Sequence, residues 1–125
     1  MTIEISGVDV NSGLDLCDGD VDIYLRILHS YVSDMVPALE RIKAVSEGTL
    51  KEYAVSIHGV KSISAAIGAE EARKTAKQLE DMAKGGDLAG VLAKNGAFVK
   101  YAENLVNGVR LWLEKNDAAG GKGGR

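Results

Sequence analysis

A histidine and a lysine near the middle of the chain have the types and the spacing needed for phosphoryl chemistry. His58 and Lys61 are three residues apart, so in a helix they lie on one face, one turn from each other. With a reference pKa of about 6.5, much of an imidazole is neutral near pH 7, and a ring nitrogen can then act as a nucleophile. An ammonium group one turn away can offset the charge of a phosphoryl group on that ring. No neighbouring acid–base group completes a reaction, which favours a carrier that borrows its catalytic machinery from partner proteins over an enzyme.

The helical phase around His58 predicts that its ring is exposed. At about 100° per residue, with His58 at zero, the apolar side chains of this segment fall on an arc between about 140° and 260°. They are Tyr53, Ile57, Val60, Ile63 and Ile67. His58 therefore lies near the centre of the opposite face, which argues against a histidine buried in the core.

The residues that share the face of His58 are unusually small for an exposed helix surface. Within about 60° of the ring on the same count lie two lysines and three small residues. They are Lys51, Lys61, Ala54, Ser62 and Ala65, with Gly59 at the edge of the face. Small side chains let another protein approach the imidazole closely, so we interpret this face as a docking surface.

Neither histidine has the surroundings of a metal or haem site. Di-iron helical proteins use Glu-x-x-His pairs, whereas the residues three positions before the two histidines are Arg26 and Val55. No Cys-x-x-Cys-His sequence is present for haem attachment. We therefore expect no metal site and no cofactor in this chain, and we interpret His29 as a solvated surface residue.

Apolar residues that recur every three or four positions predict four long helices. The first begins after Asp20, whose side chain can accept hydrogen bonds from the free backbone N–H groups of the first turn. Pro37 is expected to kink or divide this helix, because proline removes a backbone donor and clashes with the preceding turn. The apolar pattern then continues to a stop at Gly48.

The other three helices are predicted over residues 50–67, 69–84 and 88–113. Thr49 and Glu52 have the spacing of a capping box at the start of the first of these, and Gly68 is suited to a left-handed C-cap at its end. Asp87 has the side chain and position to cap the last helix.

These elements predict an all-α fold. Short connections between long helices favour antiparallel neighbours, so we expect an antiparallel up-and-down four-helix bundle preceded by a short N-terminal helical segment. The 125 residues suit a single domain, which we assign to residues 1–117. Residues 118–125 read Ala-Ala-Gly-Gly-Lys-Gly-Gly-Arg, and we expect them to form a disordered tail.

Composition narrows the classes of function. The 15 basic and 18 acidic residues give a net charge of −3, which argues against binding to nucleic acid through a basic surface. No run of about 18 apolar residues predicts a membrane span, and the first residues do not resemble a secretory signal. Cys17 is the only cysteine, which fits a reducing compartment. We expect a cytoplasmic protein.

The segment that begins at His58 also resembles a known family. Residues 58–69 read His-Gly-Val-Lys-Ser-Ile-Ser-Ala-Ala-Ile-Gly-Ala. This is similar to the signature of histidine-containing phosphotransfer (HPt) domains, which has a histidine, any residue, an aliphatic residue, lysine, glycine and a small residue, and ends in Gly-Ala. The resemblance extends over residues 7–113, and it includes Gly19-Asp20 before the first long helix and Gly86-Asp87 before the last.

The resemblance implies a function in two-component phosphorelays. His58 would accept a phosphoryl group from an aspartate of a response-regulator receiver domain and pass it to another, and Lys61 would support the phosphorylated state. The small residues around His58 would form the docking surface. Magnesium would belong to the acidic pocket of the receiver. A sensor or hybrid histidine kinase is the other implied partner, and the chain is expected to be a monomer.

One residue departs from the family pattern. Ser62 stands where the family most often has glycine, so a hydroxymethyl group lies one turn from His58. We expect it to be tolerated, with its hydroxyl within reach of phosphoryl oxygens. The alternative reading is a docking module of the same shape that binds a receiver or kinase without being phosphorylated. Ser62 favours that alternative, whereas the presence of both His58 and Lys61 argues against it.

Overall fold

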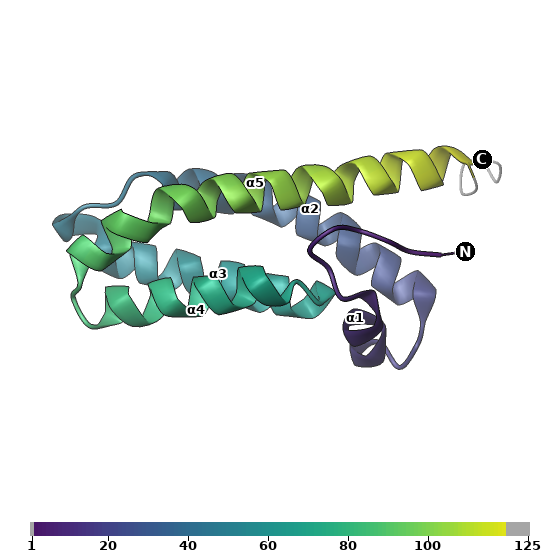
Figure 1. Ribbon diagram of the computed structural model, residues 1–125, viewed down its shortest axis with the longest axis horizontal. Helices are drawn as coiled ribbons and strands as arrows, with labels where there is room; N and C mark the ends of the chain where they lie inside the picture. Colours follow the sequence, from purple (N-terminus) through teal and green to yellow (C-terminus); the bar gives the residue numbers. More distant parts are fainter. Residues whose placement is uncertain (1, 120–125) are drawn as a thin grey trace.

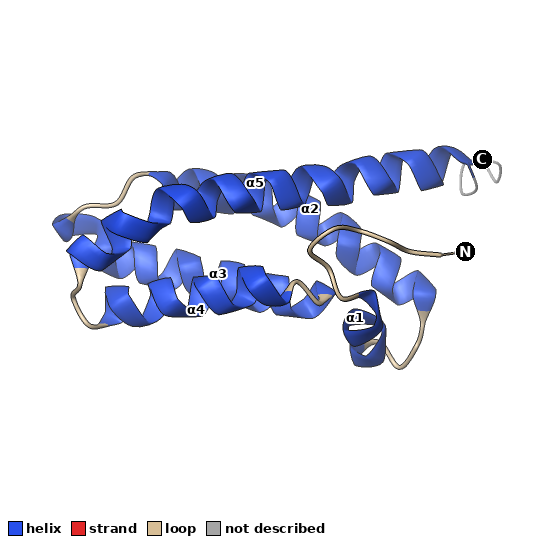
Figure 2. Ribbon diagram, in the orientation of Figure 1, coloured by secondary structure: helices blue, strands red, loops and turns tan. Residues whose placement is uncertain are grey.

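The computed structural model describes residues 2–119 and the side chains of residues 2–116. Over this part of the chain the regular elements are five α-helices and one 3-10 turn, with no strand (Figure 2). They are α1 (Val10–Leu16), α2 (Val21–Lys43), η1 (Glu47–Thr49), α3 (Leu50–Ile67), α4 (Glu70–Lys84) and α5 (Leu88–Ala119). The all-α prediction is confirmed. Helix α5 includes the first two residues of the predicted tail, and residues 120–125 lie outside the described residues.

The four long helices pack in a closed arrangement. Helix α3 packs against both α2 and α4, and α5 packs against the same two helices. Their connections are short, so each long helix runs opposite to the one before it, and the start of the described chain lies at the same end of the molecule as the end of α5 (Figure 1). The expected antiparallel up-and-down four-helix bundle is compatible with this packing. The short α1 lies against α3 and the start of α2.

Pro37 was expected to kink or divide α2, and the helix is continuous through this residue, so the proline does not divide it. Proline leaves the carbonyl of Ser33 without its usual donor, but both residues are exposed and water can supply that hydrogen bond. The helix begins as predicted, with the side chain of Asp20 accepting from the backbone N–H of Ile23 at 3.1 Å. It ends at Lys43, five residues before the predicted stop at Gly48, because Ala44 has an extended backbone.

Helix α3 has the predicted bounds, but its N-terminus is capped differently. Thr49 makes no side-chain cap with α3; its hydroxyl instead accepts from the backbone N–H of Ser46 at 2.9 Å and closes the turn η1. The expected Thr49–Glu52 capping box was therefore wrong, because the residues before Leu50 already form a 3-10 turn. At the other end, Gly68 has a φ of +86° and forms the predicted left-handed C-cap.

The C-terminus of α3 is held by α1 and α2. The hydroxyl of Tyr24 donates to the carbonyl of Ile67 at 2.7 Å, and the backbone N–H of Asp9 donates to the carbonyl of Gly68 at 2.8 Å. Gly13 of α1 lies against Tyr24, where a Cβ atom would clash with the ring. These contacts fix the position of α3 along the molecule.

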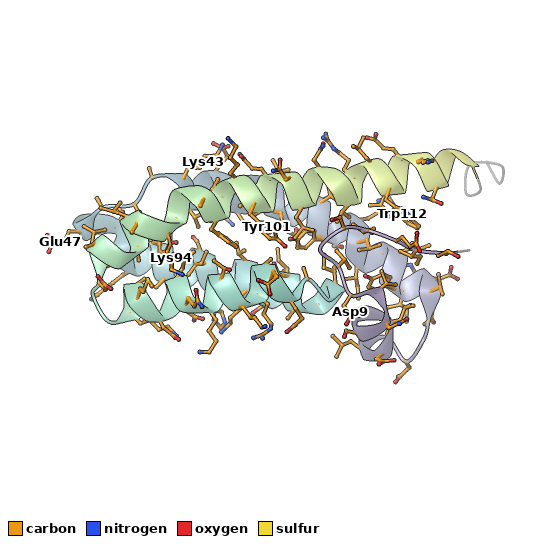
Figure 3. All side chains as sticks on the ribbon, viewed as in Figure 1. Asp9, Lys43, Glu47, Lys94, Tyr101 and Trp112 are labelled. Carbon is orange, nitrogen blue, oxygen red and sulfur yellow. The ribbon has the colours of Figure 1, made fainter. Side chains whose placement is uncertain are left out.

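Polar contacts also join the other helices. Asn95 of α5 is buried; it accepts from the Tyr53 hydroxyl of α3 at 2.6 Å and donates to the Ile42 carbonyl of α2 at 2.7 Å. At the surface, Lys43 of α2 pairs with Glu103 of α5, and Lys94 of α5 donates to Gln78 of α4. Figure 3 labels both lysines. A buried polar group with both hydrogen bonds satisfied favours one relative placement of the three helices.

Among the described residues, every helix is too short or too polar to cross a bilayer.

Candidate functional site

The structure places His58 near the middle of α3 with its side chain 56% exposed. The opposite face of the helix is buried as the phase predicted: Tyr53, Ile57, Val60 and Ile67 are in the core. Ile63, at the edge of the apolar arc, is half-buried. The imidazole is therefore an accessible group on a helix whose other side is fixed by packing.

The ring of His58 is bonded to a buried carboxylate of the neighbouring helix. Its Nδ1 atom lies 2.7 Å from Oε2 of Glu80, which belongs to α4. The side chain of Glu80 is only 2% exposed, and the ammonium groups of two lysines also contact it. Nζ of Lys61 lies 2.7 Å from Oε1, and Nζ of Lys84 lies 2.9 Å from Oε2. One carboxylate thus joins an imidazole and two cations.

The surroundings of Glu80 keep it ionised. Burial by itself raises the pKa of this carboxyl group, but the contacts from Lys61, Lys84 and His58 outweigh burial. Together they lower the pKa from its ordinary value of 4.5 to about 2. At neutral pH the group is a carboxylate, which accepts hydrogen bonds and donates none.

An ionised Glu80 determines which nitrogen of His58 carries the proton. Because the carboxylate only accepts, Nδ1 must be the donor, and a neutral ring then has its lone pair on Nε2. The Nδ1 side faces the buried carboxylate, so the exposed part of the ring is its Nε2 side. The arrangement presents one nucleophilic nitrogen to the surface and holds the other through a charged hydrogen bond.

Most of the residues predicted to surround His58 are accessible. Lys51, Gly59 and Ser62 are exposed, and Ala65 is half-buried. An added Cβ atom at Gly59 would meet nothing within 4 Å, so the surface beside the histidine is open there.

Ala54 was expected on the docking surface, and the structure shows this prediction to be wrong. Ala54 is buried in the core. Counted from His58, it lies at about −40° and Lys61 at about −60°, on the flank that faces α4. Since α3 packs against both α2 and α4, its buried surface is wider than one apolar stripe, and α4 covers this flank.

Lys61 is less exposed than its helical phase suggested. Its side chain is 24% exposed, and its ammonium group is held at the buried carboxylate of Glu80. It remains beside the histidine, as predicted, but part of its role is to neutralise a buried charge.

A groove lies on the other flank of α3, between that helix and α2. It has a volume of about 280 Å³, with Val55, Gly59 and Ile63 on the α3 side and Ala38 on the α2 side. Asp34 and Arg41 of α2 contribute one charge of each sign to its lining. Val55 is strongly exposed although it is apolar. Gly59 borders both the histidine and this groove, so the two features form one continuous surface.

Glu80 is the functional residue that sequence reasoning missed. A sequence signal for it does exist: on the helical count it lies about 70° from the centre of the apolar stripe formed by Ala72, Ala76 and Leu79. A carboxylate at the edge of a buried stripe needs a cationic or hydrogen-bonding partner. The identity of that partner depends on how α4 packs against α3, which local periodicity does not specify.

Over the residues that the structure describes, no group of three or more His, Cys, Asp or Glu side chains is arranged to hold a metal ion. Comparison of the chain with protein-family models, with curated proteins and with solved structures gave no match.

Proposed function

We propose that this chain is a histidine phosphotransfer protein, a four-helix bundle that relays a phosphoryl group between receiver-domain aspartates through phospho-His58. The observation that carries the proposal is the exposed imidazole of His58 with its Nδ1 atom 2.7 Å from the buried Glu80 carboxylate. A histidine held in this way has a defined nucleophilic atom and a defined orientation.

The transfer step follows from the tautomer. The lone pair of Nε2 attacks the phosphorus of an aspartyl phosphate, the N–P bond forms, and the P–O bond to the aspartate breaks with its electrons leaving on the carboxylate. The ring keeps its proton on Nδ1 and becomes positively charged. Glu80 stabilises that charge from 2.7 Å, and the reverse sequence passes the group to a second receiver.

The residues near the ring support the phosphorylated state. Lys61 contributes positive charge one turn from His58, and the exposed hydroxyl of Ser62 is within the same turn. The magnesium ion that such a transfer requires is expected in the acidic pocket of the receiver. The chain thus acts as a carrier whose catalytic groups belong to its partners.

The surface around His58 suits a protein partner. Its exposed part includes Lys51, Gly59 and Ser62, and it continues into the groove between α2 and α3. Small residues around His58 leave room for the edge of a receiver's active site to approach the ring. The positive charge of the lysines complements the acidic pocket of the receiver. The proposed partners are receiver domains and a sensor or hybrid histidine kinase. The proposal also takes the chain to be a monomer in the cytoplasm, which rests on the sequence alone.

The test is a phosphotransfer assay with the full chain and a receiver domain phosphorylated on its aspartate. We expect an acid-labile gain of one phosphoryl group on this protein, measured by intact mass. His58→Gln should fold normally and take up no label, whereas His29→Gln, a change at the other histidine of the chain, should be labelled like the wild type. Labelling that persists in His58→Gln would overturn the site.

The docking module remains the second candidate, and Ser62 is the feature that favours it. The docking-module hypothesis predicts that receivers bind this chain with measurable affinity, but that none of them transfers a phosphoryl group to His58. Binding without transfer by the wild type, together with transfer by Ser62→Gly, would show that the hydroxymethyl group separates the two functions.

A further inference from the structure

The two oxygens of Glu80 have different sets of partners. Within the described part of the chain, Oε1 is contacted by one cation, the ammonium group of Lys61 at 2.7 Å. Oε2 is contacted by two groups, Nδ1 of His58 at 2.7 Å and Nζ of Lys84 at 2.9 Å. The lysines are therefore not equivalent, although both contact the same carboxylate.

The cost of moving each lysine differs accordingly. If Lys61 left Glu80, a buried carboxylate oxygen would lose its cation and would be left uncompensated. If Lys84 left, Oε2 would keep its contact with His58. The exposed fractions also indicate that Lys84 is easier to move, because its side chain is 63% exposed and that of Lys61 is 24% exposed. Lys84 also stands at the last position of α4, and its four-carbon stem is intrinsically flexible.

We infer that Lys84, four residues after Glu80, is the mobile counter-ion of the phosphoryl group on His58, whereas Lys61 stays as the fixed counter-ion of Glu80. The inference rests on the proposed function. When Nε2 carries the phosphoryl group, the ring is positive and becomes the stronger partner of Oε2. Lys84 is then released from the carboxylate and moves to the phosphoryl oxygens, which carry nearly two negative charges.

This exchange leaves the buried carboxylate with a cationic partner in both states. Before transfer, Lys61, Lys84 and the ring of His58 contact it. After transfer, Lys61 and the charged ring contact it, and Lys84 offsets part of the negative charge of the incoming group. The effect on phosphohistidine has a definite sign. Phosphoryl transfer passes through a loose transition state in which the bond to the ring is largely broken. A cation on the phosphoryl oxygens therefore stabilises the phosphorylated ground state more than it stabilises that transition state.

The experiment uses the full chain with His29→Gln as the background, phosphorylated by phosphoramidate. This small donor passes its phosphoryl group to Nε2 and releases ammonia, so no receiver is needed. The variants are Lys84→Gln, Lys84→Arg and Lys61→Gln. Lys77→Gln is the matched control, since Lys77 is an exposed lysine of α4 that pairs with Asp81 and not with Glu80.

The first readout is the lifetime of phospho-His58. The second is the phosphoryl equilibrium with a receiver at low and high salt, and thermal unfolding is measured before phosphorylation.

Lys84→Gln should shorten the lifetime about two- to fivefold and shift the equilibrium toward the receiver by the same factor, as expected for a partly exposed charge pair. The effect should shrink in high salt, Lys84→Arg should restore it, and the thermal midpoint should match that of Lys77→Gln. Lys61→Gln, unlike Lys84→Gln, should lower the thermal midpoint, because it leaves the buried Glu80 without its fixed counter-ion. A Lys84→Gln lifetime equal to that of Lys77→Gln would overturn the inference. Absence of transfer from every receiver, with a normal lifetime pattern from phosphoramidate, would overturn the proposed function alone.

Discussion

The imidazole of His58 and the carboxylate of Glu80 meet at 2.7 Å, although one side chain is 56% exposed and the other 2% exposed. The two residues belong to adjacent antiparallel helices and are 22 positions apart. Their contact couples an exposed ring to a charge held in the interior, so a group below the surface sets which ring nitrogen carries the proton.

In Glu80→Gln, the ring of His58 should keep a hydrogen-bond partner at position 80, but that partner no longer carries a charge. We expect phosphoryl transfer to slow about tenfold to a hundredfold, because the positive ring loses its electrostatic stabilisation. In ¹⁵N NMR spectra, the single Nδ1–H tautomer of neutral His58 should give way to a mixture. Asp81→Asn is the control, since Asp81 is an exposed neighbour that pairs with Lys77. A transfer rate in Glu80→Gln equal to that of Asp81→Asn would show that the charge of Glu80 is irrelevant.

The ionisation of Glu80 also predicts how stability depends on pH. Its pKa is about 2 in the folded chain and 4.5 ordinarily, so protonation favours the unfolded state. The stabilisation is fully present above about pH 4.5 and is lost as the pH falls toward 2. Urea unfolding of wild type and Glu80→Gln should therefore differ most near neutral pH and converge as the pH falls to about 2. A difference that stays constant over this range would contradict the ionised state of Glu80.

Lys61→Ala tests the fixed role of this lysine. Its helical phase alone predicts little effect on stability, whereas its contact with buried Glu80 predicts a loss of about 1–2 kcal/mol. Lys51→Ala, an exposed lysine near the same face, should change the free energy of unfolding by less than about 0.5 kcal/mol. Equal unfolding free energies for the two variants would mean that Lys61 contributes only to the chemistry.

The parts of the fold that follow from local periodicity could be predicted from the sequence. The buried faces of α3 and α4, with Ile57, Val60 and Leu79 in the core, repeat every three or four residues along one chain segment. Gly68 was equally predictable, because a left-handed C-cap is a local requirement on one residue. His58 was placed on the exposed face by the same count.

What the sequence did not show depends on contacts between helices. Ala54 is buried because α4 covers one flank of α3, and periodicity along α3 carries no record of α4. Glu80 meets His58 only once the two helices are aligned side by side. The continuity of α2 through Pro37 depends in a similar way on surroundings, since an exposed carbonyl can be hydrated and a buried one cannot. In these three cases the environment of the residue is supplied by another element or by solvent. The Thr49–Glu52 capping box failed for a local reason, because Thr49 already closes the turn η1 with Ser46.

Gly59→Ala separates the stability of the helix from access to the site. Gly59 lies inside α3, where alanine is favoured over glycine by up to about 1 kcal/mol, and an added Cβ atom would meet nothing within 4 Å. The variant should therefore unfold at a higher urea concentration than the wild type.

The same methyl group would project between His58 and the groove that contains Val55, so receiver binding should weaken about threefold to tenfold. Gly96→Ala in α5, which is equally open and lines a different surface, should gain similar stability without loss of binding. If Gly59→Ala binds receivers as tightly as Gly96→Ala, the docking surface does not include this flank of α3.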